Sequence, residues 1–241
     1  MSQTTVFLGA TSSIAQACLH KGIKEGRHIT LVGRNRSELE QISNDVGMPK
    51  YVVDCCDIQA VADTLADISQ TRQVESVVCF VGSFMLKPAH LLSERDWNQT
   101  LHTNLTSAFA AVHGSTKVML KTGGQIILLS SAVADIGLMN HEAISAAKAG
   151  VIGLAKATAA SYAKNGIRVN CVAPGMVESK LSSRILANPQ GKALSISAHP
   201  LGRVGKPQDV ADVVNMLLHS EWITGEVIKV DGGLSQIKIV K

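Results

Sequence analysis

The chain has 241 residues, of which 46% are hydrophobic and 17% charged, and its net charge is +4. This balance excludes a disordered polar chain and is typical of a single globular domain, residues 1–241, with a complete core. Its lysines and arginines are scattered, so we do not expect a nucleic-acid partner. The chain has no apolar run of membrane-spanning length and starts without the features of a secretory signal, which favours a cytoplasmic protein with no membrane partner.

The cysteines carry information about redox environment and metals. There are five of them, an odd number, and no two are spaced as in a CxxC pair. This pattern favours a reducing compartment and argues against a metal-binding framework. We therefore expect the cysteines to be small buried residues and predict no metal site.

Short apolar runs alternate with segments of helical periodicity along the whole chain. In order, the expected strands are 6–8, 29–32, 51–53, 77–81, 126–129, 169–172 and 227–230. Of the expected helices, the first ends near residue 25 and the fourth near residue 120, and the others span 37–46, 58–70, 141–164 and 207–219. Continuous Val, Ile and Leu runs separated by helices are typical of parallel strands buried on both faces. The pattern predicts an α/β, Rossmann-type fold: a doubly wound, parallel, seven-stranded sheet with helices on both faces.

Two segments depart from this regular alternation. Residues 174–206, approximately, have weak periodicity, and a connection of that length inside a compact domain is typical of a functional lid, here over a substrate. The helix after His141 is apolar on most faces and rich in small residues, which indicates burial and close approach of a second helix. We therefore expect a subunit interface at this helix.

The first strand runs into a glycine turn that opens a helix, Gly9-Ala10-Thr11-Ser12-Ser13-Ile14-Ala15. Such a turn directs backbone N–H groups and the positive end of a helix dipole at a pyrophosphate. We expect contacts from Gly9, Thr11, Ser12, Ser13 and Ile14. The alternative is an ordinary strand-to-helix connection capped by Ser12 or Ser13.

The second strand ends in Arg34, with no carboxylate to accept from adenosine ribose hydroxyls. A guanidinium here can stack on adenine and pair with a 2′-phosphate, which favours NADP(H) over NAD(H). The alternative is a solvated surface arginine.

Further motifs follow the later strands. They are Asp54-Cys55-Cys56-Asp57, Cys79-Phe80-Val81-Gly82, Asn104, Ser130-Ser131, Lys148, Pro174-Gly175 with Val177 and Ser179, and the C-terminal Val230-Asp231-Gly232-Gly233. With the Gly9 loop, they resemble the short-chain dehydrogenase/reductase family over nearly the whole chain, and within it the 3-oxoacyl-acyl-carrier-protein reductases.

The resemblance implies a homo-oligomer, a tetramer or a dimer, with the helix that contains Lys148 in the interface. It also implies a role for each matching residue. Asn104, Ser131 and Lys148 match the family's catalytic asparagine, serine and lysine, and Lys148 would also hold the nicotinamide ribose. The remaining matches would bind the cofactor: Asp54 and Cys55 beside adenine, Gly82 in the family's NNAG slot, and Pro174, Gly175, Val177 and Ser179 near the nicotinamide amide.

Three positions depart from the family pattern. Ser13 stands where the loop has its second glycine, so its side chain either weakens phosphate binding or adds a ligand. Cys79 replaces the first asparagine of the NNAG slot, where we expect packing. Ile144 stands where the catalytic tyrosine belongs, four residues before Lys148, and neither of the two tyrosines precedes a lysine at that spacing.

The missing phenol leaves the proton donor open. General acid catalysis is worth about 10²–10⁴-fold in rate. His141, near the start of the same helix, is a candidate substitute because imidazole titrates near neutrality, although a histidine that only caps or packs is the alternative.

Three functions follow from these motifs. The first is an NAD(P)(H)-dependent oxidoreductase that interconverts a carbonyl and a secondary alcohol on a small-molecule or acyl substrate, with an atypical proton donor. The second is a catalytically silent NADP(H)-binding protein or the partner subunit of an active relative. The third is an interaction protein that has lost the cofactor.

Overall fold

The computed structural model describes residues 2–238, and within them seven strands form one sheet. The strands are β1 (Gln3–Leu8), β2 (Ile29–Gly33), β3 (Lys50–Val52), β4 (Gln73–Cys79), β5 (Gly124–Leu129), β6 (Ile167–Pro174) and β7 (Val227–Val230). All neighbours pair in parallel, in the order β3-β2-β1-β4-β5-β6-β7. The predicted seven-stranded parallel sheet is confirmed.

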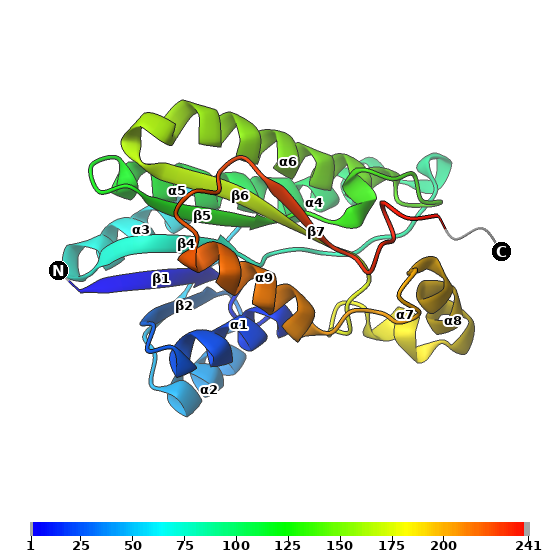
Figure 1. Cartoon of the computed structure of the whole chain (residues 1–241), viewed down its shortest axis with the longest axis horizontal. Helices are drawn as coiled ribbons and strands as arrows, with labels where there is room; N and C mark the ends of the chain where they lie inside the picture. The colour runs from blue at the N-terminus through cyan, green and yellow to red at the C-terminus, as the bar shows by residue number, and fades with distance from the viewer. Residues whose placement is uncertain (1, 239–241) are drawn as a thin grey trace.

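Helices cover both faces of the sheet, as predicted (Figure 1). They are α1 (Ser13–Lys24), α2 (Arg36–Val46), α3 (Ile58–Thr71), α4 (Glu94–Leu101), α5 (Ser107–Met119), α6 (Glu142–Tyr162), α7 (Ser183–Ala187), α8 (Pro189–Ala198) and α9 (Pro207–His219). Helices α1, α2 and α9 pack on one face, and α3, α5 and α6 on the other. Helices α7 and α8 stand apart, beyond the carboxyl ends of the strands (Figure 1).

Each face of the sheet has its own aliphatic core. Val6, Leu8 and Ile126 point to the α3–α5–α6 side, whereas Phe7 and Ile127 point to the other side. Neighbouring residues of a strand point to opposite faces, which is why both strands are apolar throughout. All five cysteines are buried and unpaired, as expected.

Three element boundaries differ from the sequence prediction. Strand β4 begins at Gln73 because Gln73 and Val74 pair with the first residues of β1, and it ends at Cys79 rather than at residue 81. The helical region that ends near residue 120 is divided into α4, one π-helical turn (His102–Thr106) and α5. The expected lid contains α7 and α8, neither of which buries a residue.

The sheet order places a cleft at a predictable point. The chain proceeds from β1 outward to β3, then returns to the other side of β1 with β4. Ligands of open α/β sheets bind at such a reversal, at the carboxyl ends of the strands. Within residues 2–238 no helix is long and apolar enough to cross a membrane.

Candidate active site

A cleft of about 860 Å³ lies at this reversal point, between the carboxyl ends of the strands and the lid. The loops that follow β1 to β6 and both lid helices contribute to its walls. Every residue assigned to a site from the sequence lines it: Gly9, Thr11, Ser12, Ser13, Ile14, Arg34, Asp54, Cys55, Gly82, Asn104, Ser131, His141, Lys148, Pro174, Gly175, Val177 and Ser179. Their individual roles stay predictions.

The loop from β1 to α1 lines the cleft and has backbone amides without a protein acceptor. Gly9 has a φ of 78°, and a Cβ on it would lie 3.0 Å from the Val81 backbone nitrogen. Ser12 caps α1 by accepting from the Ala15 amide at 3.1 Å. Within residues 2–238, the amides of Ser13 and Ile14 donate to no protein acceptor. Unpaired amides at a helix N-terminus suit a phosphate group, so this end of the cleft fits a pyrophosphate.

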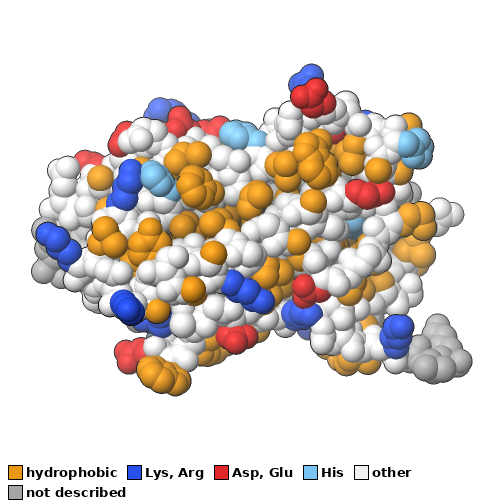
Figure 2. Space-filling view, turned by 90° about the horizontal axis from the view of Figure 1, so that it is seen from above, with side chains coloured by type: hydrophobic (Ala, Val, Ile, Leu, Met, Phe, Trp, Pro, Cys, Tyr) orange, Lys and Arg blue, Asp and Glu red, His pale blue; other side chains and the backbone are white. Residues whose placement is uncertain are grey.

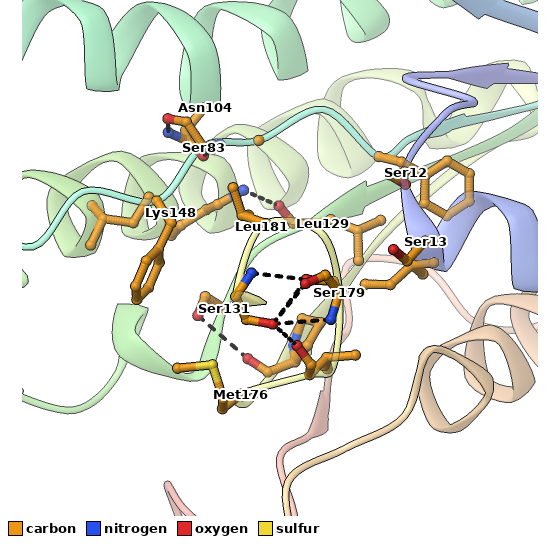
Figure 3. A pocket seen from close by; sticks show the side chains of 18 of the residues that line it. Ser12, Ser13, Ser83, Asn104, Leu129, Ser131, Lys148, Met176, Ser179 and Leu181 are labelled. Atoms are coloured by element: carbon orange, nitrogen blue, oxygen red, sulfur yellow. Dashed lines mark hydrogen bonds between the residues drawn. The ribbon is translucent and has the colours of Figure 1, made fainter. Parts of the chain in front are cut away.

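Ser13 connects this loop to the lid. Its Oγ accepts a hydrogen bond from the Lys180 amide at 3.4 Å. The adjoining lid turn is held by Ser182, whose hydroxyl donates to the Val177 carbonyl at 2.6 Å and accepts from the Ser179 amide at 3.0 Å (Figure 3). The extra hydroxyl therefore bonds to lid backbone, a contact that the loop sequence alone did not indicate.

The end of the cleft near β2 is charged. Arg34 is exposed there, and the Asp54 carboxylate accepts from the Cys56 amide at 3.0 Å. Glu38, in the first turn of α2, forms an ion pair with Lys180 of the lid. Both partners line the cleft, and neither was identified from the sequence, because the pair joins segments 142 residues apart.

Lys148 lies on α6 with 7% of its surface exposed. Its ammonium donates to the Leu129 carbonyl at 2.8 Å (Figure 3). The backbone carbonyl of Lys148 accepts from the Ser130 hydroxyl at 2.9 Å, which fixes α6 against the end of β5. Burial lowers the pKa of Lys148 from 10.5 to about 8.

Asn104 lies on the π-helical turn between α4 and α5, a distortion common at functional sites. Its side-chain nitrogen donates to Ser83 Oγ at 2.9 Å and to the Thr100 carbonyl at 3.0 Å, and its oxygen accepts from the Ser83 amide at 3.1 Å. Gly82 lies between this pair and Lys148, because a Cβ on it would be 3.3 Å from Asn104 Oδ1 and 3.6 Å from Lys148 Nζ. Ser83 was not identified from the sequence, although it follows Gly82 directly.

Ser131, which follows β5, and Ile144, on α6, both line the cleft. The Ser131 hydroxyl donates to the Pro174 carbonyl at 3.4 Å, a long bond that a substrate oxygen could replace. Ile144 is one helical turn before Lys148, is 3% exposed and lines the same cleft. An alkyl side chain therefore lines the cleft one turn before Lys148.

His141 lies at the mouth of the cleft, just before the first turn of α6. Its Nδ1 is 2.7 Å from the Met139 carbonyl, and its ring centroid is 5.9 Å from that of Phe84 in an edge-on arrangement. His141 thus precedes α6 as its N-cap residue and lines the same cleft as Ile144 and Lys148.

The part of the cleft beneath the lid is apolar. Its lining side chains include Phe84, Leu138, Ile144, Met176, Leu181 and Leu194. Met176 and Leu181 are among the lining side chains drawn in Figure 3. A neutral, apolar group fits this part better than a charged one.

The comparisons agree with the geometry. Residues 9–235 match the family model described as "Enoyl-(Acyl carrier protein) reductase". The chain is 29% identical to 3-oxoacyl-[acyl-carrier-protein] reductase FabG of Rickettsia bellii, over 98% of each chain, and 31% identical to D-threitol dehydrogenase of Mycolicibacterium smegmatis, over 93% of this chain and 90% of that one.

Among solved structures, a putative NAD(P)-dependent gluconate 5-dehydrogenase from Beutenbergia cavernae with bound NADP is similar, with a TM-score of 0.90 and 27% identity over 97% of each chain. The fold and the matching sequences therefore place the chain among oxidoreductases with a Rossmann-type fold. The chain belongs to the short-chain dehydrogenase/reductase family and is similar to the FabG reductases within it.

Proposed function

We propose that the chain is an NAD(P)(H)-dependent oxidoreductase that interconverts a carbonyl and a secondary alcohol, with a proton donor other than tyrosine. One observation carries the proposal: Lys148, Ser131 and the unpaired amides at the start of α1 line one continuous cleft. The substrate is a small molecule or an acyl compound, and the apolar lining under the lid favours an uncharged one.

The residues present fit a nicotinamide dinucleotide. The Ser13 and Ile14 amides would take the pyrophosphate, and Asp54 and Cys55 would border the adenine. The exposed Arg34 guanidinium would pair with a 2′-phosphate, which favours NADP(H) over NAD(H). Bound there, the reduced cofactor supplies the hydride.

At the other end of the cofactor, Lys148 has one protein acceptor among the described residues, the Leu129 carbonyl, and its remaining N–H groups can donate to ribose hydroxyls. The segment that carries Pro174, Gly175, Val177 and Ser179 would contact the nicotinamide amide.

The chain's own residues would act on the substrate oxygen. Ser131 donates a hydrogen bond that stabilises negative charge as it develops there. Asn104 and Ser83 hold the loop after β4 in place beside Lys148. Ile144 gives the reacting region an apolar wall, which lowers the local dielectric and strengthens these electrostatic contacts.

A homo-oligomer is also proposed. Helix α6 exposes alanines and glycine rather than charges at Ala146, Ala149 and Gly153, and Phe109 on α5 is 42% exposed. Figure 2 looks down on this side of the molecule and shows apolar side chains spread over much of it. Small side chains permit close helix packing between copies of the chain.

One observation favours a second candidate function. Ile144 cannot donate a proton. The same cofactor-binding residues would therefore also serve a protein that binds NADP(H) without turnover, either alone or as the partner subunit of an active relative. A single assay of ketone reduction distinguishes the two functions. We would supply NADPH with trifluoroacetophenone, an activated apolar ketone, and measure both the loss of NADPH and the alcohol formed.

The proposed enzyme forms the alcohol in an amount equal to the NADPH consumed, and Ser131→Ala slows this by about 10²-fold or more. NADPH binding with no alcohol, also after wider ketone screening, would establish the silent protein instead.

A further inference from the structure

The cleft lacks the phenol that serves this family as proton donor, and no tyrosine moves in to replace it. The Tyr51 hydroxyl donates to Asp67 Oδ2 at 2.8 Å in an exposed hydrogen bond. Tyr162 is the last residue of α6 and packs against the core on the α3–α5–α6 side of the sheet. Neither lines the cleft. The donor must therefore be another group.

Most other candidates are unsuited to the task. The hydroxyls of Ser83 and Ser131 are aliphatic alcohols, which are far weaker acids than a phenol. His141 precedes α6, three residues before Ile144 and seven before Lys148; its Nδ1 is occupied by the Met139 carbonyl at 2.7 Å, and its ring is held edge-on against Phe84. Glu142 is exposed, and its carboxylate accepts from the Ala89 amide.

Lys148 differs from these groups in position and bonding. It follows Ile144 by one helical turn on the same face of α6, so its side chain reaches the cleft beside the apolar wall. Among the described residues its ammonium has a single hydrogen-bond acceptor, the Leu129 carbonyl. Two of its three N–H groups are thus available to the ligands of the cleft.

Among residues 2–238, no acidic side chain pairs with Lys148. The titratable groups that face it are two buried thiols, Cys79 at the end of β4 and Cys171 on β6. Burial raises the pKa of both thiols, that of Cys171 to about 12, so both are neutral. The other neighbours, Gly82, Asn104 and Ser130, carry no charge. No anion retains the proton on Nζ.

We propose that the Lys148 ammonium is itself the proton donor, acting through one water molecule between Nζ and the substrate oxygen in the cleft that Lys148 and Ile144 both line. This inference rests on the proposed function. The water would have at least two polar partners, Lys148 Nζ and the substrate oxygen, as a site for ordered water requires.

The step is balanced. The carbonyl carbon gains the hydride from reduced NADP(H), and the C=O π pair becomes the electron pair on oxygen. That oxygen takes a proton from the water, the water takes one from Lys148 Nζ, and the lysine remains as a neutral amine. Bulk solvent then reprotonates the amine.

The acidity of Lys148 suits this role. Burial lowers its pKa to about 8, so the ammonium is mostly protonated at neutral pH yet much more acidic than an ordinary lysine. Because the protonated form is needed for reduction, kcat for ketone reduction should fall as pH rises through about 8.

The test combines a pH profile with a direct titration. The NMR signal of Lys148 in ¹³C-lysine-labelled protein, identified by its absence in Lys148→Arg, should titrate near pH 8, and kcat with NADPH and trifluoroacetophenone should fall over the same range. Lys148→Arg keeps the positive charge and donors but does not release a proton, so it should bind NADPH while kcat drops by about 10²-fold or more.

Two further variants complete the test. Lys156→Arg, at an exposed position of the same helix, is the matched control and should behave as wild type. Ile144→Tyr supplies a phenol one turn before Lys148 and should raise kcat.

The possible failures are distinguishable. Alcohol formation that is flat across pH 8, wild-type turnover by Lys148→Arg, or titration of Lys148 near about 10.4 as in an ordinary lysine overturns this inference and leaves the proposed function standing. NADPH binding without any turnover by wild type overturns both.

Discussion

The backbone amide of Met176 donates a hydrogen bond to Nε2 of His199 at 3.1 Å, and this bond joins the lid to the end of the central sheet. The other ring nitrogen donates to the Ser195 carbonyl of α8 at 2.6 Å. The ring is 4% exposed, and Gly175 passes so close that a Cβ there would be 2.6 Å from Nε2. One buried imidazole thus connects α8 with the segment proposed to contact the nicotinamide.

Replacing His199 should loosen the lid. His199→Ala leaves the Met176 amide and the Ser195 carbonyl without their partner, and we expect the free energy of unfolding to fall by about 1–3 kcal/mol. Limited proteolysis should cut the 174–206 segment faster than in wild type. His20→Ala, at an exposed site on α1, is the control. Equal protease sensitivity of the two variants would show that His199 does not hold the lid.

Alanine substitutions at two glycines with nearly the same backbone conformation can distinguish the cost of backbone strain from the cost of steric crowding. Gly9 and Gly26 have φ of 78° and 75°, but a Cβ on Gly9 meets Val81 at 3.0 Å whereas a Cβ on Gly26 meets nothing within 4 Å. Gly26→Ala should therefore lower the free energy of unfolding by about 1 kcal/mol from the backbone alone. Gly9→Ala should cost more and also abolish NADPH binding, as measured by denaturation and calorimetry. Equal losses would contradict the crowding seen at Gly9.

Arg34 should set the preference between the two cofactors. A hydrogen-bonded charge pair with the 2′-phosphate is worth about 1.5–3 kcal/mol. Arg34→Ala should therefore weaken NADPH binding about 10- to 100-fold and change NADH binding little. Arg36→Ala removes a neighbouring arginine that is paired with Glu40, and should change neither affinity. A loss shared equally by NADPH and NADH would mean that Arg34 does not recognise the 2′-phosphate.

Ser83 should hold Asn104 in place. Ser83→Ala removes the hydroxyl that accepts from Asn104 Nδ2, and leaves that buried N–H one partner short. We expect a loss of about 1–2 kcal/mol in the free energy of unfolding, together with slower ketone reduction. Ser161→Ala, at an exposed position of α6, should be neutral. Unchanged stability and turnover in Ser83→Ala would remove Ser83 from the site.

Much of the fold was predictable because the strands are buried on both faces. Runs such as 126–129 have no polar face, and only a parallel sheet covered by helices accommodates them in series. The lid helices were not predicted, since no residue of α8 is buried and its sequence has no amphipathic stripe. The start of α8 depends on local chemistry instead: the Asn188 side chain accepts from the Gln190 and Gly191 amides, and Pro189 is the first helical residue.

The candidate site was predictable where its residues lie in one loop or follow a strand end. The Gly9 loop and Ser131 are of this kind, whereas Lys148, on α6, was found by its match to a family motif; all line the cleft. Contacts between distant segments carry no such local signal. The Glu38–Lys180 pair and the bond from His199 to Met176 exist only because the lid folds back over the sheet.

The central claim is that the start of α1 binds the phosphates of a nicotinamide dinucleotide, and calorimetric titration of the wild-type chain with NADPH tests it most directly. We predict saturable binding at one site per chain, retained by Gly26→Ala and lost in Gly9→Ala. A titration without binding heat at several temperatures, or binding that Gly9→Ala leaves intact, would contradict the account.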